Sequence, residues 1–195
     1  MPGMPASWTS SDVPRAIGLL RAVNVGGRVL RMEDLRAIMS RLGYAGSQTL
    51  LQSGNVVFGF AIGSKPQTAM DIEGRIEREL QSRLSLQADV FVRSADEWED
   101  VMAGNPFRAE AKADPAHLVL MVLRDKPAPA AVKTLQAGIK GRETVRAGER
   151  HLYIVYPDGV GPSKLTGTVI ERTLSTRGTA RNWNTVTKLA ALARA

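Results

Sequence analysis

Cysteine is absent from this sequence, and histidine and aromatic residues are scarce. The 195 residues include no Cys, only two His (His117 and His151) and 5% aromatic residues. Disulfides, thiolate nucleophiles, cysteine-ligated zinc and iron–sulfur clusters all require cysteine, and a multi-histidine metal site requires more than two histidines. We therefore expect no metal site and no cofactor, and the choice of catalytic groups is narrow.

Long apolar runs are also missing. The longest is Leu118–Leu123, whereas a helix that spans a bilayer needs roughly 20 apolar residues. The first eleven residues are rich in Pro, Ser and Gly, and they lack the basic start and apolar segment of a secretory signal. These features predict a cytoplasmic protein with a loose N-terminal tail and no membrane partner.

Positive charge is distributed unevenly along the chain. The net charge is +7, yet residues 1–104 hold 11 Lys and Arg against 12 Asp and Glu. Residues 105–195 hold 15 against 7, so the whole excess lies in the second half. Such an asymmetry favours an anionic partner.

The apolar pattern of the first half alternates between strand and helix periods. Leu35, Ile38, Met39 and Leu42 follow helical spacing, and Ser53-Gly54 marks a hairpin turn between two strand-like runs. The expected elements, in the order strand, helix, strand, strand, helix, strand, are 16–23, 32–42, 47–52, 55–60, 70–84 and 89–93. This β-α-β-β-α-β order is ferredoxin-like.

The second half begins with the same order. Ser94 and Glu97 predict a capping box at the start of a short helix. The elements expected next are a strand at 117–123, a helix at 130–139, a hairpin at 143–156 and a helix beginning at Ser163. A final strand is either missing or very short, and residues 182–193 have helical spacing.

These patterns predict an α+β protein made of two ferredoxin-like halves with antiparallel sheets and a C-terminal helical extension. The expected organisation is a tail at 1–13, a first half at 14–93, a helical linker at 94–113 and a second half at 114–195.

Four separated motifs together resemble the bacterial DUF1697 family over residues 15–193. They are 20–27 (LRAVNVGG), 52–58 (QSGNVVF), 156–165 (YPDGVGPSKL) and 179–189 (TARNWNTVTKL). Ala22 stands where the family usually has Gly, a conservative departure. The resemblance implies a compact α+β fold and a bacterial cytoplasmic setting. It implies no reaction, cofactor or catalytic residue, because the function of the family is unknown.

Two candidate binding turns lie in the first half. The loop that contains Asn24, Gly26 and Gly27 connects a strand to a helix, where converging N–H groups can hold a phosphate. Gln52 and Asn55 flank the hairpin turn and offer paired donors and acceptors to a ligand. The alternative is that the glycines only form the turn and that the hairpin side chains only satisfy their own backbone.

The candidates in the second half are basic or aromatic. Lys164, placed in the first turn of a helix, is explained if it faces an anion, because the helix dipole disfavours a cation there. Arg181 and Lys188 are candidate phosphate contacts, and Trp183 is a candidate stacking surface for a base. The alternative is that Asn182 or Asn184 caps the helix while Trp183 fills the core.

Three functional hypotheses remain open. The leading one is the binding of a nucleic acid or a nucleotide phosphate by Lys164, Arg181 and Lys188, with help from the glycine loop. The second is an enzyme acting on a small phosphorylated or carboxylated substrate at the seam between the halves, where Asp158 and Lys164 join the candidate turns. The third is a structural or assembly protein, and the sequence leaves the oligomeric state undetermined.

Overall fold

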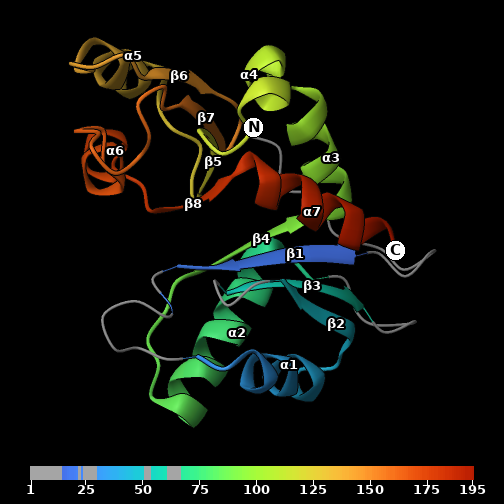
Figure 1. Ribbon diagram of the computed structural model, residues 1–195. Coiled ribbons are helices and arrows are strands. Elements are labelled where there is room, and N and C mark those ends of the chain that lie inside the picture. Colours follow the sequence, from blue (N-terminus) through green and yellow to red (C-terminus); the bar gives the residue numbers. More distant parts are fainter. Residues whose placement is uncertain (1–14, 22, 24–29, 51–53, 61–66) are drawn as a thin grey trace, which may run out of the picture. The chain divides into compact units, whose positions relative to one another are not determined.

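The computed structural model describes residues 15–21, 23, 30–50, 54–60 and 67–195. The chain divides into two compact units (Figure 1). The first unit comprises Met1–Glu99 together with Leu189–Ala195, and the second comprises Asp100–Lys188. Within the described residues, no helix is both long enough and apolar enough to cross a membrane.

The first unit has the predicted β-α-β-β-α-β order. Its elements are β1 (Arg15–Leu20), α1 (Met32–Arg41), β2 (Tyr44–Leu50), β3 (Asn55–Phe60), α2 (Ala69–Leu84) and β4 (Val90–Ser94). The four strands form one antiparallel sheet in the order β2-β3-β1-β4. The two middle strands are β3 and β1, which confirms the ferredoxin-like arrangement.

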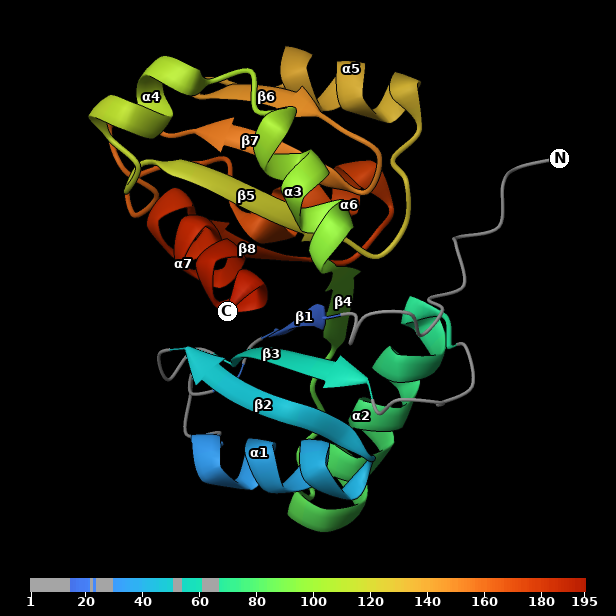
Figure 2. The same ribbon diagram turned by 90° about the vertical axis from the view of Figure 1, so that its right-hand side faces the viewer.

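The core of the first unit lies between its sheet and its two helices, which cover one face of the sheet (Figure 2). Leu35, Ile38 and Met39 of α1 are buried, because they recur at helical spacing on one side of that helix. Val56 and Phe58, which alternate along β3, belong to the same cluster.

The second unit repeats this topology. Its elements are α4 (Arg108–Ala113), β5 (Leu118–Leu123), α5 (Pro129–Ala137), β6 (Thr144–Ala147), β7 (His151–Val155), α6 (Gly167–Leu174) and β8 (Gly178–Asn182). The antiparallel sheet has the order β6-β7-β5-β8. The final strand is therefore present and short. Two further helices, α3 (Ala95–Ala103) and α7 (Trp183–Arg194), contribute residues to both units.

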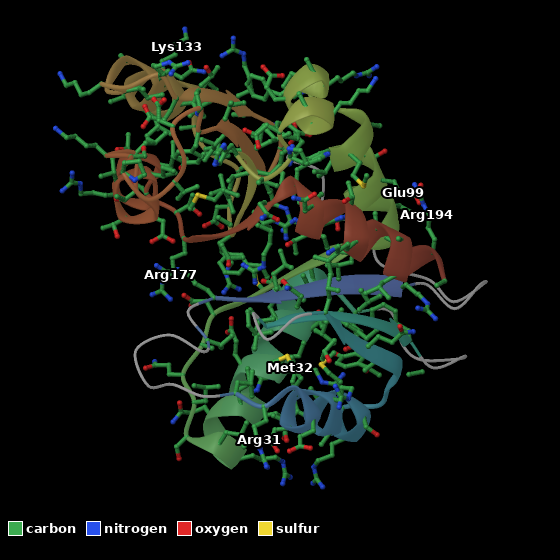
Figure 3. All side chains as sticks on the ribbon, in the orientation of Figure 1. Arg31, Met32, Glu99, Lys133, Arg177 and Arg194 are labelled. Carbon is green, nitrogen blue, oxygen red and sulfur yellow. The ribbon has the colours of Figure 1, made fainter. Side chains whose placement is uncertain are left out.

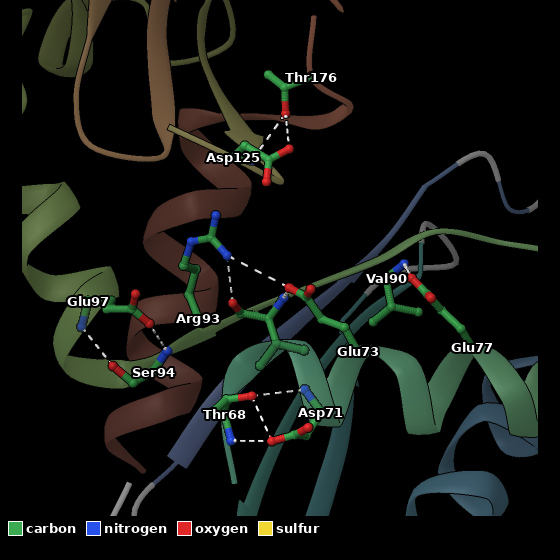
Figure 4. Close-up of polar contacts among 11 residues, drawn as sticks. Thr68, Asp71, Glu73, Glu77, Val90, Arg93, Ser94, Glu97, Asp125 and Thr176 are labelled. Carbon is green, nitrogen blue, oxygen red and sulfur yellow. Dashed lines mark hydrogen bonds and ion pairs between the residues drawn. The ribbon is translucent and has the colours of Figure 1, made fainter. Parts of the chain in front are cut away.

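Helix caps match between the two units. Thr68 caps α2 and Thr166 caps α6, with side chains that accept hydrogen bonds from N–H groups of the first turn and with nearly equal backbone angles. Each helix ends at a serine in the left-handed conformation, Ser85 with φ of 49° and Ser175 with φ of 53°. The predicted capping box of α3 is also present, between Ser94 and Glu97 (Figure 4).

In each unit, carboxylates of the helix before the last strand, α2 or α6, bind that outer strand of the sheet. Glu73 Oε1 accepts a hydrogen bond from the Val92 N–H (2.8 Å), and Glu77 accepts one from the first residue of β4 (2.9 Å; Figure 4). In the second unit, Glu171 Oε1 accepts one from the Gly178 N–H (2.8 Å). These contacts satisfy N–H groups that an edge strand leaves unpaired.

One predicted helix start is wrong, and one candidate residue lies in a strand. Helix α6 begins at Gly167 rather than Ser163, because Thr166 provides the N-cap. Ser163 instead accepts a hydrogen bond from the Leu165 N–H (3.0 Å) in the preceding loop. Helix α7 begins at Trp183, close to the predicted start at residue 182, and Arg181 lies before it in strand β8.

Candidate ligand pocket in the second unit

Most candidate residues of the first unit lie outside the described residues. This holds for Asn24, Gly26, Gly27 and Gln52. Asn55 is described, and its side chain is fully buried. Its Nδ2 donates a hydrogen bond to the Leu50 carbonyl oxygen (3.0 Å), which ties together the two strands of the hairpin.

The basic and aromatic candidates near the C-terminus make structural contacts. Arg181 Nη1 donates to Thr179 Oγ1 and to the Ala180 carbonyl oxygen, both at 2.8 Å, and burial lowers the pKa of Arg181 to about 10. The Trp183 side chain is buried, with its ring centre 6.4 Å from that of Tyr153. The base-stacking surface predicted at Trp183 is therefore not exposed in this structure.

The start of α7 is capped by Asn182. Its Oδ1 accepts hydrogen bonds from the N–H and the hydroxyl of Thr185, both at 3.0 Å. Lys188 lies exposed on α7. None of Arg181, Trp183 and Lys188 lines the pocket of the second unit that is described next, to which Lys164 contributes. Of the predicted residues that the structure describes, only Lys164 and the enzyme candidate Asp158 line that pocket.

This second-unit pocket has a volume of about 490 Å³, within the range of roughly 300–1,000 Å³ typical of small-molecule sites. It lies at the end of α5, before β6, and beside α6. The lining residues are Thr134, Leu135, 138–143, 156–159, 162–165, Val169 and Thr173. The sequence motif at 156–165 thus forms much of one wall.

The loop at 156–165, called the wall loop below, is held by hydrogen bonds at both ends. The Gly159 N–H donates to the Tyr156 carbonyl oxygen (2.9 Å), and Gly159 has φ of +86°, a conformation that favours glycine. The Tyr156 hydroxyl donates to the Leu165 carbonyl oxygen (3.0 Å). Burial, with a smaller effect of the Glu143 charge, raises the pKa of Tyr156 to about 12, so this hydroxyl stays a donor.

Glu143 is the acidic group that the fold brings to the loop. Its Oε1 accepts a short hydrogen bond from the Ser163 hydroxyl, while its buried Oε2 has no hydrogen-bond partner among the described residues. The Ser163 hydroxyl, and secondarily nearby backbone N–H groups, lower the pKa of Glu143, so the carboxylate is ionised at neutral pH. A Cβ at Gly141 would collide with Oε2, so the glycine leaves room for the Glu143 carboxylate in its present position.

Three basic side chains also line the pocket. Arg142 Nη1 forms an ion pair with Asp158 Oδ1 (2.8 Å), and both groups are largely exposed. Lys140 and Lys164 are exposed too, and within the described part of the chain neither makes an ion pair or a side-chain hydrogen bond. These two ammonium groups are therefore available to an anion.

Glu143 and Lys140 also line the pocket, although no sequence motif singled them out. Glu143 lies 20 residues from Ser163, and only the meeting of the β6 start with the wall loop joins them. The turn composition at 156–161 was a usable signal, whereas no local pattern marks Glu143. Among the described residues, no group of three or more His, Asp or Glu side chains is placed to hold a metal ion.

Two successive ferredoxin-like units, one with a ligand-sized pocket, define the class as a duplicated-topology α+β protein. The chain belongs to the DUF1697 family, described as proteins of unknown function, whose model matches residues 13–153. The pocket wall at 156–165 lies beyond the matched residues.

A solved structure with the same fold is that of the conserved bacterial protein SP0830 from Streptococcus pneumoniae. The two chains are 19% identical with a TM-score of 0.66, and the match covers 92% of this chain and 98% of the other. Comparison with curated proteins gave no match.

Proposed function

We propose that this protein binds a small anionic ligand, phosphate- or carboxylate-bearing, in the second-unit pocket. The observation that carries the proposal is the pair of lysines, Lys140 and Lys164, which line a pocket of ligand size without partners among the described residues. A lysine ammonium is a compact donor that suits phosphate and carboxylate oxygens.

The charge distribution supports an anionic ligand. Residues 105–195 hold 15 Lys and Arg against 7 Asp and Glu. Such an excess raises the local concentration of anions and speeds their association, with an effect that weakens as salt increases.

A nucleotide or another small phosphate ester is favoured over a nucleic acid strand. A strand would need stacking surfaces and a continuous row of cations. Trp183 is buried and Arg181 is hydrogen-bonded within its own strand, so the C-terminal motif offers less of both than the sequence suggested.

An enzyme acting on the same anionic ligand is the second candidate. It is favoured by the joint presence of Asp158 and Lys164 in the pocket lining, where an acid and a base can act on one bound molecule. Incubation with phosphate esters followed by phosphorus NMR tests the hydrolytic form of this activity, because attack of water on the ester releases inorganic phosphate and the alcohol, and mere binding does not.

Calorimetry on the full chain tests the binding proposal. At low salt we expect ethyl phosphate to bind, and the Lys164→Ala variant to bind it about tenfold more weakly, the cost of roughly one charged hydrogen bond. Lys133→Ala is the matched control, since Lys133 is an exposed lysine of α5 outside the pocket lining (Figure 3). Equal affinities for the two variants, or no binding of any anion, would contradict the proposal.

A further inference from the structure

The first unit contains a half-buried arginine, Arg75, whose position has an equivalent in the second unit. Arg75 of α2 donates from Nη1 to Gln67 Oε1 (2.7 Å) and from Nη2 to the Leu42 carbonyl oxygen (3.2 Å). Its guanidinium carbon lies 5.6 Å from the ring centre of Tyr44. The guanidinium thus fills the space between the end of α1, the start of β2 and the start of α2.

The repeated topology identifies the equivalent place in the second unit. Arg75 is the seventh residue after the N-cap Thr68, and Thr173 is the seventh after the N-cap Thr166. Thr173 has a short side chain whose hydroxyl donates back to the carbonyl oxygen of Val169 (2.8 Å). No guanidinium extends from this position of the second unit.

The residues around the guanidinium have equivalents as well. Gln67 directly precedes the N-cap of α2, as Leu165 directly precedes that of α6. The C-cap of α1 is Leu42 and that of α5 is Gly138. Thr173, Leu165 and Gly138 all line the second-unit pocket. The pocket therefore occupies the place that the Arg75 guanidinium fills in the first unit.

A hydrogen-bond acceptor lies at this place in the second-unit pocket. Glu143 directly precedes β6, as Tyr44 begins β2, and it lines the pocket. Its Oε1 is bonded to Ser163, and its buried Oε2 has no partner among the described residues. A carboxylate oxygen removed from water without a donor is destabilising, and a cationic donor in the pocket would relieve that cost.

We propose that the ligand of the second-unit pocket is zwitterionic, with an ammonium or guanidinium group that takes the place of the Arg75 guanidinium and contacts Glu143. Its anionic group is held by Lys140 and Lys164, so the inference rests on the proposed function and adds the second half of the ligand. The chemical class is that of aminoalkyl or guanidinoalkyl phosphates and amino acids.

A matched pair of probes tests the cationic half. Phosphoethanolamine and ethyl phosphate share the phosphate ester, and only the first carries an ammonium group. Calorimetry with the full chain is expected to show phosphoethanolamine, or its guanidino analogue, binding at least tenfold more tightly than ethyl phosphate. The Glu143→Gln variant should lose this preference, so that it binds the two probes with equal affinity.

The outcomes separate the two claims. Equal binding of both probes to the wild-type chain overturns the zwitterion and leaves anion binding intact, whereas binding of neither overturns both.

The Thr173→Arg variant gives a readout without ligand, because it places a guanidinium in the pocket as the first unit does. We expect it to raise the melting temperature and to block phosphoethanolamine. The equivalence of the Arg75 and Thr173 positions would be contradicted if Thr173→Arg lowered the melting temperature and if adding Glu143→Gln to this variant left that temperature unchanged.

Discussion

The two units share one topology and differ in what fills the space between the ends of their helices. In the first unit, Arg75 occupies that space and bonds to Gln67 and to the end of α1. In the second unit, Thr173 stands at the same helical position and a pocket of about 490 Å³ remains. At this helical position the first unit thus has a guanidinium, whereas the second has a short side chain beside a pocket.

The largest expected effect concerns the contact between α2 and β4 in the first unit. Glu73→Ala removes the acceptor of the Val92 N–H and leaves the buried Arg93 guanidinium, 3.9 Å from Glu73, without this carboxylate. Arg93 keeps its hydrogen bond to the Val92 carbonyl oxygen, so the loss is that of a buried acceptor and one ionic contact, about 3 kcal/mol of unfolding free energy. Denaturant unfolding measures it.

Two controls set the scale of that effect. Glu79→Ala breaks an i,i+4 ion pair with Arg83 on the same helix, near the surface, which is worth at most about 0.5 kcal/mol. Glu171→Ala removes the corresponding contact of the second unit, to Gly178, and should fall between the two. A Glu73→Ala loss no larger than that of Glu79→Ala would show that the helix carboxylate does not hold the strand.

Removing the arginine converts the first unit toward the second. Arg75→Ala eliminates two hydrogen bonds and the contact with the Tyr44 ring, a loss of about 2–3 kcal/mol. Millimolar methylguanidinium should restore part of the melting temperature of this variant and leave the wild type unchanged. Absence of rescue would mean that the Arg75→Ala variant has no cavity that accepts a guanidinium.

Gly141→Ala sharpens the account of the pocket itself. The added Cβ would collide with Glu143 Oε2 and turn the carboxylate away from Ser163, so the expected cost is that of one hydrogen bond, about 1 kcal/mol. Gly161→Ala is the matched control, because an added Cβ there meets nothing within 4 Å. Thermal unfolding compares the two, and equal melting temperatures would refute the fixed position of Glu143.

The smallest effect is expected at the exposed ion pair of the pocket. Asp158→Asn removes the partner of Arg142, and exposed pairs contribute at most about 1 kcal/mol. We expect a change in unfolding free energy below about 0.5 kcal/mol, measured by urea denaturation. A larger loss would show that this ion pair contributes to the stability of the second unit as the contacts of Arg75 do in the first.

Much of the fold was predictable from the sequence because it depends on local patterns. The spacing of Leu35, Ile38 and Met39 located α1, and Ser94 with Glu97 located the start of α3. Strand β8 was the uncertain element, since its residues lack a continuous apolar run and two of them are buried. It forms through pairing with β5, which no local pattern encodes.

The candidate site was predictable only in part. The turn at 156–161 and the neighbouring Lys164 mark one wall of the pocket. The start of α6 was misplaced, since both Ser163 and Thr166 are good N-caps and the contact of Ser163 with Glu143 decides between them. The Trp183 motif is conspicuous in sequence, yet its indole is part of the packed interior.

The most direct test is an amide NMR titration of the full chain with phosphoethanolamine. Chemical shifts are expected to change at 138–143 and 156–165 of the second unit, whereas the amides of α1, β2 and α2 in the first unit stay unchanged. Shifts that are absent from 138–143 and 156–165, or that spread evenly over exposed lysines such as Lys133 and Lys188, would contradict the proposal.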